Sequence, residues 1–205
     1  PDDGRTVDTL VKALYEVMDG FTVSEEHRVL FVTAPCGVGK TLALSLLSAD
    51  RKGRAAWFSF PTNQLASEFV KAAPLNLMSV HCQGELSGAD LPKLRAHGAE
   101  LVNATLVHPT LLSAVKADGA SSRFEGLTIF VDEWHNLSDN QLKVLHTLLQ
   151  KTAVKLVLLS ATPRDTQYQD LKALFPGACR EHVISVQSAI DEQLLRPRLY
   201  FDGTE

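Results

Sequence analysis

The sequence predicts an α/β fold, a largely parallel sheet of about seven strands with helices on both faces. Short apolar runs alternate with segments whose apolar residues recur at helical spacing, which is typical of βαβ units. A glycine-bearing loop joins one such run directly to a helical segment. The chain has 205 residues, 45% of them hydrophobic, which suffices for one large domain with a buried core.

Strands are expected where a short apolar run is bounded by polar or turn residues, since strands of a parallel sheet are buried on both faces. In chain order, the runs that meet this description are residues 29–33, 55–60, 77–81, 101–105, 127–131, 154–160 and 182–186.

Helices are expected between these runs. The first covers residues 7–18, and Gly20 is expected to end it. Pro61 suits the first turn of a helix, and Ser138 suits an N-cap. The later helices are expected at residues 39–48, 62–73, 110–117, 139–150 and 166–175. Residues 83–98, which carry three glycines and a proline, are expected to be irregular.

Composition excludes several classes of protein. Charged residues make up 21% of the chain and the net charge is −4, which argues against a disordered chain and against a strongly basic nucleic-acid clamp. No apolar run approaches the roughly 18 residues that span a bilayer, and no signal peptide is visible. The cysteines Cys36, Cys82 and Cys179 are odd in number and widely spaced, which favours a reducing, intracellular setting over a metal site.

A phosphate-binding loop is predicted between the run 29–33 and the helix that follows it. Backbone N–H groups at a helix N-terminus bind phosphate, Lys40 adds a positive charge for the β- and γ-phosphates, and the Thr41 hydroxyl can ligate Mg²⁺. Ala34 replaces the first glycine of the usual G-x-x-x-x-G-K-[ST] pattern, whereas Gly37 and Gly39 remain. The predicted nucleotide-binding residues are Ala34, Pro35, Cys36, Gly37, Val38, Gly39, Lys40 and Thr41.

Two acids follow the run 127–131. Ligands of open α/β sheets lie at the carboxyl ends of the strands, so Asp132 and Glu133 can face the same nucleotide as the phosphate loop. Asp132 is assigned to the hydrated Mg²⁺, and Glu133 to the attacking water, which it orients and deprotonates. Together with Lys40 they are the predicted catalytic residues. The alternative for the dipeptide alone is a solvated acidic turn.

The run 154–160 also ends in hydroxyl residues, Ser160 and Thr162, on either side of Ala161. Taken in order, these blocks resemble the first RecA-like domain of superfamily 2 helicases and translocases of the DExH group. Asp132-Glu133-Trp134-His135 matches the D-E-x-H box and Ser160-Ala161-Thr162 the S-A-T motif. Residues 60–66 are similar to the P-T-x-x-L-A element. The resemblance covers residues 28–185 and includes viral RNA helicases.

The resemblance implies a RecA-like P-loop NTPase fold and a division of the chain. Residues 1–26 would be an N-terminal helix and lead-in, residues 27–186 the first RecA-like ATP-binding domain, and residues 187–205 an exit towards a second RecA-like domain. ATP or another NTP with Mg²⁺ is the implied cofactor pair. The implied partners are single-stranded nucleic acid, with RNA favoured over DNA, and that second domain.

The resemblance also implies roles outside the nucleotide site. His135 and the turn of Ser160, Ala161 and Thr162 would couple the nucleotide to the nucleic acid. Nucleic-acid phosphates would be contacted by Pro61, Thr62, Asn63 and Thr105, with ordinary capping as the alternative for the two threonines. The sequence departs from the usual T-P-G form after Thr105, so His108 or Thr110 is the alternative contact.

The implied function is NTP hydrolysis coupled to translocation on nucleic acid or to its unwinding. The chain has no Q-x-x-G-R-x-G-R-like stretch, so we expect these residues alone to bind Mg-nucleotide weakly, to hydrolyse it slowly and not to unwind a duplex. The alternatives are a P-loop ATPase of a DNA translocase or packaging motor, and a non-catalytic nucleotide-gated interaction module. The expected location is the cytoplasm, the host's if the protein is viral.

The remaining residues with chemical potential are assigned structural roles. Trp134 is expected to pack, and Cys36 to fill space in the loop, with a regulatory thiol as the alternative. The histidines His81, His97, His146 and His182 show no metal-ligand spacing and are expected at the surface or as hydrogen-bonded structural residues. The helical positions expected in the core are Leu142, Leu145, Leu148 and Leu149.

Overall fold

The computed structural model describes residues 5–49, 56–72, 79–82, 100–103, 126–161, 165–174, 177 and 179–185. They contain a seven-stranded sheet in the order β3-β4-β2-β5-β6-β1-β7, in which all six strand pairs are parallel. The strands are β1 Val29–Thr33, β2 Ala56–Ser59, β3 Ser79–Cys82, β4 Glu100–Asn103, β5 Thr128–Val131, β6 Lys155–Ser160 and β7 Cys179–Val183. The predicted fold class is confirmed.

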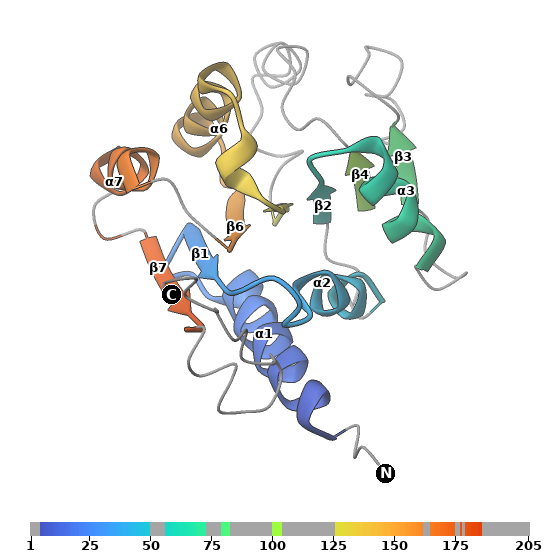
Figure 1. The fold of residues 1–205 in the computed structure, drawn as a ribbon. Coiled ribbons are helices and arrows are strands. Elements are labelled where there is room, and N and C mark those ends of the chain that lie inside the picture. Colours follow the sequence, from blue (N-terminus) through green and yellow to red (C-terminus); the bar gives the residue numbers. More distant parts are fainter. Residues whose placement is uncertain are drawn as a thin grey trace, which may run out of the picture.

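Helices cover both faces of this sheet (Figure 1). The described helices are α1 Arg5–Val23, α2 Lys40–Ala49, α3 Asn63–Ala72, α6 Asp139–Lys151 and α7 Asp165–Leu174, with a 3-10 helix η2 at Trp134–Asn136. One core cluster joins α1, α2 and α3 to the sheet, and a second joins α6 to the other face. The helix predicted over residues 110–117, the irregular stretch 83–98 and the exit 187–205 lie outside the described residues.

The central strands are buried on both faces, as their continuous apolar sequences predict. Every residue of β2 and β5 is buried, and so is every residue of β6 after Lys155. The predicted core leucines of α6 are buried, and Trp134 packs beside Phe31 with its ring centroid 5.7 Å away. Ser138 caps α6 as predicted, in a capping box with Gln141.

The predicted end of the first helix was wrong, because α1 continues past Gly20 to Val23. Phe21 is 1% exposed and belongs to the core, and burial of an aromatic side chain outweighs the roughly 1 kcal/mol that a helical glycine costs. Lys155 holds this end of the helix. Its ammonium donates to the carbonyls of Phe21, Thr22 and Ser24 and lies 5.4 Å from the centroid of the Phe21 ring.

The last strand begins earlier than predicted, at Cys179 and not at His182. Arg180 and Glu181 are exposed, so this strand has no apolar run by which a sequence pattern could find it. It is held by parallel pairing with β1, in which Val29 lies opposite Cys179, and by the Ile184 N–H donating to the Thr33 carbonyl over 2.8 Å. Backbone pairing at the sheet edge decides the position of β7.

Candidate nucleotide site

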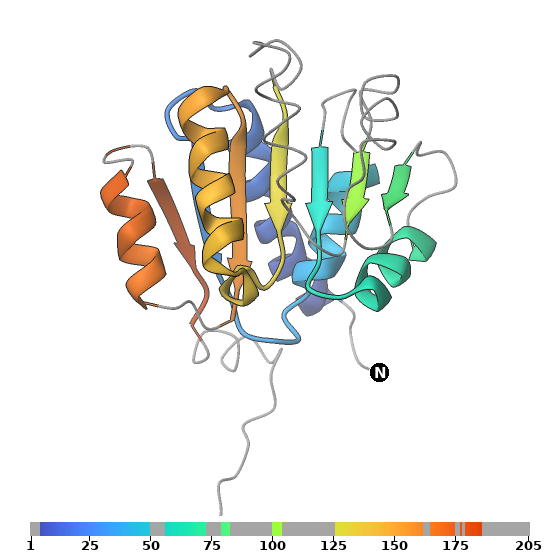
Figure 2. The same ribbon diagram turned by 90° about the horizontal axis from the view of Figure 1, so that it is seen from above.

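Three connections that carry predicted site residues lie at one edge of the sheet. The β1–α2 loop, the turn after β5 and the β2–α3 connection all follow the carboxyl ends of parallel strands, along the lower edge of the sheet in Figure 2. Strands β5, β6 and β1 are direct neighbours. The fold therefore brings the phosphate loop, the acid pair and the end of β6 to the same place, as the sequence predicts.

The phosphate loop has a backbone that only glycine adopts readily. Gly37 and Gly39 have φ values of 83° and 93°, in the left-handed region. A Cβ atom built on Gly39 would lie 2.5 Å from Cγ2 of Val11, which projects from α1. Two features therefore require glycine at position 39: its positive φ angle and the close approach of α1.

Lys40 points back into the loop that precedes it. Its side chain is buried, and its ammonium donates to the Ala34 carbonyl over 2.7 Å and to the Pro35 carbonyl over 3.2 Å. The next residue, Thr41, is exposed, and α2 begins with the Ala43 N–H donating to the Gly39 carbonyl. The backbone N–H groups before Ala43 lie in the first turn, where the helix itself supplies no carbonyl acceptor. Such N–H groups at a helix N-terminus bind anions.

Asp132 ends β5 in a buried position. Its N–H donates to the Ser59 carbonyl over 2.9 Å, and its side chain is 9% exposed. Burial and the charge of Glu133 raise the pKa of Asp132, whereas Lys40 and the Glu133 N–H lower it, and the net result is a pKa of about 6. The negative charge is only partly compensated, so this carboxylate favours a nearby cation.

Glu133 has the left-handed backbone, with φ 49° and ψ 48°, and no other non-glycine residue among those described has a positive φ. Such strain is usual at functional sites. Its Oε2 lies 3.2 Å from Nδ1 of His135. The same nitrogen lies 2.7 Å from Oγ of Ser160, and the Ser160 carbonyl accepts the Ala34 N–H over 3.0 Å. These bonds join the acid pair, β6 and the phosphate loop into one polar network.

The predicted nucleic-acid residues are only partly described. Thr62 caps α3: its Oγ1 accepts the Leu65 N–H over 3.2 Å, and its side chain is exposed, so the hydroxyl proton remains available to a phosphate. Pro61 precedes it, and Asn63 begins α3. Ala161 follows β6 and is partly buried. Thr162, Thr105, His108 and Thr110 lie outside the described residues.

The residues present fit a magnesium ion that is brought by a nucleotide. Thr41 and Asp132 would supply oxygen ligands, the type that Mg²⁺ takes while keeping several waters and phosphate oxygens. Among the described residues, no group of three or more histidine, cysteine, aspartate or glutamate side chains could hold a metal ion. A protein-only metal cage is therefore not found in that part of the chain.

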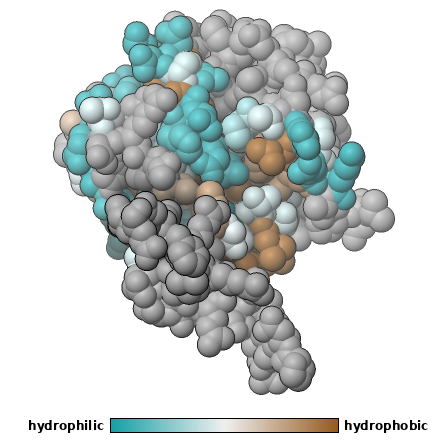
Figure 3. Space-filling view, in the orientation of Figure 1, coloured by the Kyte–Doolittle hydropathy of each residue, from teal (hydrophilic) through white to brown (hydrophobic). Residues whose placement is uncertain are grey.

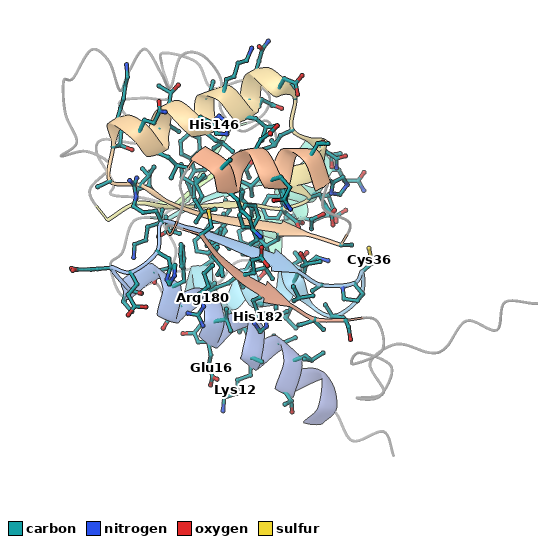
Figure 4. All side chains as sticks on the ribbon, turned by 90° about the vertical axis from the view of Figure 1, so that its left-hand side faces the viewer. Lys12, Glu16, Cys36, His146, Arg180 and His182 are labelled. Carbon is teal, nitrogen blue, oxygen red and sulfur yellow. The ribbon has the colours of Figure 1, made fainter. Side chains whose placement is uncertain are left out.

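Among the described histidines and cysteines, His135 and Cys36 belong to the predicted site. Figure 4 labels His146 on α6 and His182 on β7, and Cys36, an exposed free thiol, on the phosphate loop. His146 is partly exposed, but its Nε2 is buried with no hydrogen-bond partner, which contradicts the expected alternative of a fully hydrogen-bonded histidine, and burial lowers its pKa. The side chains of His81 and His97 are not described.

Two features of the site carry no signal in the sequence. Val11 is one apolar position among several in the stripe of α1, and nothing in its spacing marks it as the neighbour of Gly39. The surface beside Thr41 is also apolar: Leu42 and Leu46 of α2 are 50% and 44% exposed, and Leu65 of α3 is 40% exposed. Figure 3 shows hydrophobic residues gathered over α2 on this face.

Comparison with known proteins gives a family and several structural neighbours. The profile of the DEAD/DEAH box helicase family matches residues 13–171. No protein with a curated description matches the chain in sequence. No helix among the described residues is long and apolar enough to cross a bilayer.

Three solved structures illustrate the likeness. The DUF1998 helicase MrfA bound to DNA is 20% identical with a TM-score of 0.54, over 86% of this chain and 27% of that one. The Hef helicase domain of Pyrococcus furiosus is 18% identical with a TM-score of 0.53, over 86% and 39%. Dbp5 of S. cerevisiae, bound to RNA and ADP BeF3, is 17% identical with a TM-score of 0.56, over 85% and 46%. The chain therefore spans less than half of each protein, and the likeness concerns the fold.

Proposed function

This chain belongs to the DEAD/DEAH box helicase family, and we propose that it is the nucleotide-hydrolysing motor domain of a DExH-type helicase that acts on nucleic acid. One observation carries the proposal. Buried Lys40 and buried Asp132 meet at one sheet edge, close enough for the lysine charge to lower the carboxyl pKa against the effect of burial. A cation and an anion held in this way, beside a glycine loop, suit a magnesium-bound triphosphate.

In this proposal Lys40 changes its hydrogen-bond partners when the nucleotide binds. Its ammonium leaves the Ala34 and Pro35 carbonyls and donates to the β- and γ-phosphates. The phosphates also accept hydrogen bonds from the N–H groups in the first turn of α2. Asp132 and Thr41 would hold a magnesium ion, which would offset the negative charge of the phosphates. The ion would also compensate the negative charge of the buried Asp132 carboxylate.

Glu133 acts on the water that attacks the γ-phosphorus. The new phosphorus–oxygen bond forms as the bond to the β–γ bridging oxygen breaks, and the proton released by the water passes to the Glu133 carboxylate. The left-handed backbone and the contact with His135 Nδ1 fix the direction of this carboxylate. Orientation of this kind is the main contribution a protein makes to phosphoryl transfer.

The network from Glu133 through His135 and Ser160 to Ala34 is the proposed coupling path between nucleotide and nucleic acid. Pro61, Thr62, Asn63 and Thr105 remain the proposed contacts with nucleic-acid phosphates. Single-stranded RNA is the proposed substrate. A DNA translocase is the alternative, and DNA as the substrate is supported by the likeness to the helicase MrfA, whose structure contains DNA. A viral source and a cytoplasmic location stay predictions from the sequence.

A second RecA-like domain is the proposed partner of the apolar surface formed by Leu42 and Leu46 beside Thr41. The division into residues 1–26, 27–186 and 187–205 belongs to the same proposal. A partner domain that supplies an arginine to the transferring phosphoryl group raises rates by about 10³- to 10⁵-fold in such enzymes. We therefore expect the 205 residues alone to turn over slowly.

Steady-state release of phosphate from ATP, with and without single-stranded RNA or DNA, tests the proposed function. The chain is expected to hydrolyse Mg-ATP slowly, to be stimulated by RNA more than by DNA, and to separate no duplex. A longer parent protein is expected to be faster. Stimulation by DNA alone would support the translocase, and an absence of nucleotide binding would overturn the proposal.

A further inference from the structure

Helix α1 touches the phosphate loop at its most constrained residue. Val11 is 3% exposed, and its Cγ2 lies 2.5 Å from the position that a Cβ of Gly39 would occupy. Gly39 is also the residue whose carbonyl accepts the first bond of α2. The methyl group of Val11 thus fills the space that the missing side chain of Gly39 leaves.

Helix α1 is held firmly enough to act as a support. Leu10, Leu14 and Met18 are buried in the same core cluster as Val38 of the loop. At the carboxyl end of the helix, the Lys155 ammonium binds the carbonyls of Phe21, Thr22 and Ser24. A cation at this position also favours the helix dipole. Val11 is therefore presented to Gly39 by a helix that is anchored from Leu10 to its carboxyl end.

We propose that Val11 is a positioning residue for the phosphate loop, through which α1 sets the affinity of the site for nucleotide. The inference rests on the proposed function for its ligand, Mg-NTP, but the contact itself does not. Removal of the two Val11 methyl groups leaves a void beside a residue with no side chain to fill it. The loop can then leave the conformation that aims its amides at phosphate.

Val11→Ala tests this inference, with Val144→Ala as the matched control. Val144 is 5% exposed, lies on α6 and belongs to the cluster on the other face of the sheet, so the same two methyl groups are removed away from the loop. Val11→Ala is expected to weaken binding of a fluorescent Mg-ATP analogue about tenfold. Its KM should rise while kcat changes little, because the acid pair is untouched. Equal effects of both variants, or none, would overturn the inference.

Hydrogen exchange separates this inference from the proposed function, because it needs no ligand. Loop amides of residues 36–39 are expected to exchange about tenfold faster in Val11→Ala than in the wild type, and unchanged in Val144→Ala. In addition, Gly39→Ala should destabilise the Val11→Ala background less than the wild type, because Cγ2 is gone. Unaltered loop exchange, or equal costs in both backgrounds, would refute the role of Val11 even if the protein binds no nucleotide.

Discussion

Replacing Glu133 by glutamine is expected to lower kcat for nucleotide hydrolysis by about 10²- to 10⁴-fold, the range found for general acid–base groups. The amide keeps the size and shape of the side chain but cannot accept the proton of the attacking water. Binding of Mg-nucleotide is expected to stay within about twofold, because Lys40, Thr41 and Asp132 are unchanged. The measurement is steady-state phosphate release together with a nucleotide titration.

Glu26→Gln is the matched control for this substitution. Glu26 is exposed and precedes β1, at the sheet edge opposite the site, so the same chemical change should leave turnover at the wild-type value. Thermal unfolding of Glu133→Gln checks that the left-handed turn is retained. Wild-type turnover by Glu133→Gln would contradict the role of Glu133 and would assign the attacking water to another residue.

Replacing Asp132 by asparagine is expected to stabilise the protein at neutral pH while it removes magnesium-dependent hydrolysis. Burial, with the charge of Glu133 and despite that of Lys40, raises the pKa of Asp132 from 3.8 to about 6, so the folded state binds a proton more tightly than the unfolded chain does. The stability that this group contributes is present below pH 3.8 and is lost as the pH rises through about 6. Asparagine has no charge to bury.

The size of the effect follows from the pKa difference. A pKa raised from 3.8 to about 6 corresponds to about 3 kcal/mol, so at pH 7 the free energy of unfolding of Asp132→Asn should exceed that of the wild type by up to that amount. Near pH 4 the two proteins should unfold with similar free energies. Denaturant unfolding at both pH values measures the difference. Equal stability at pH 7 would mean that the carboxylate is already compensated and is not poised for a cation.

Local patterns were enough to predict the centre of the fold and the sheet edge at which the proposed site residues lie. β1 begins and ends where the apolar run does. A strand that is buried on both faces consists of consecutive apolar residues, so its bounds can be predicted from the sequence. The phosphate loop and the acids after β5 were placed at one edge by the topology of parallel strands alone. The capping box at Ser138 is likewise a purely local signal.

The features that were missed depend on contacts between distant segments. α1 continues beyond Gly20 for two reasons. Phe21 is buried in the core, and Lys155, which is distant in the sequence, donates to carbonyls at the end of the helix. β7 is located by pairing with β1 and not by its exposed side chains. The left-handed backbone of Glu133 cannot be predicted from its residue type, since glutamate has no preference for that conformation.

The central claim is that Lys40 and Asp132 act on one magnesium-bound triphosphate. Titration of a fluorescent ATP analogue, with and without Mg²⁺, tests it in the wild type, Lys40→Ala and Asp132→Asn. Lys40→Ala is expected to lose binding under both conditions, whereas Asp132→Asn should lose only the increase in affinity that Mg²⁺ gives the wild type. Wild-type binding by Lys40→Ala, or an undiminished effect of Mg²⁺ in Asp132→Asn, would contradict the claim.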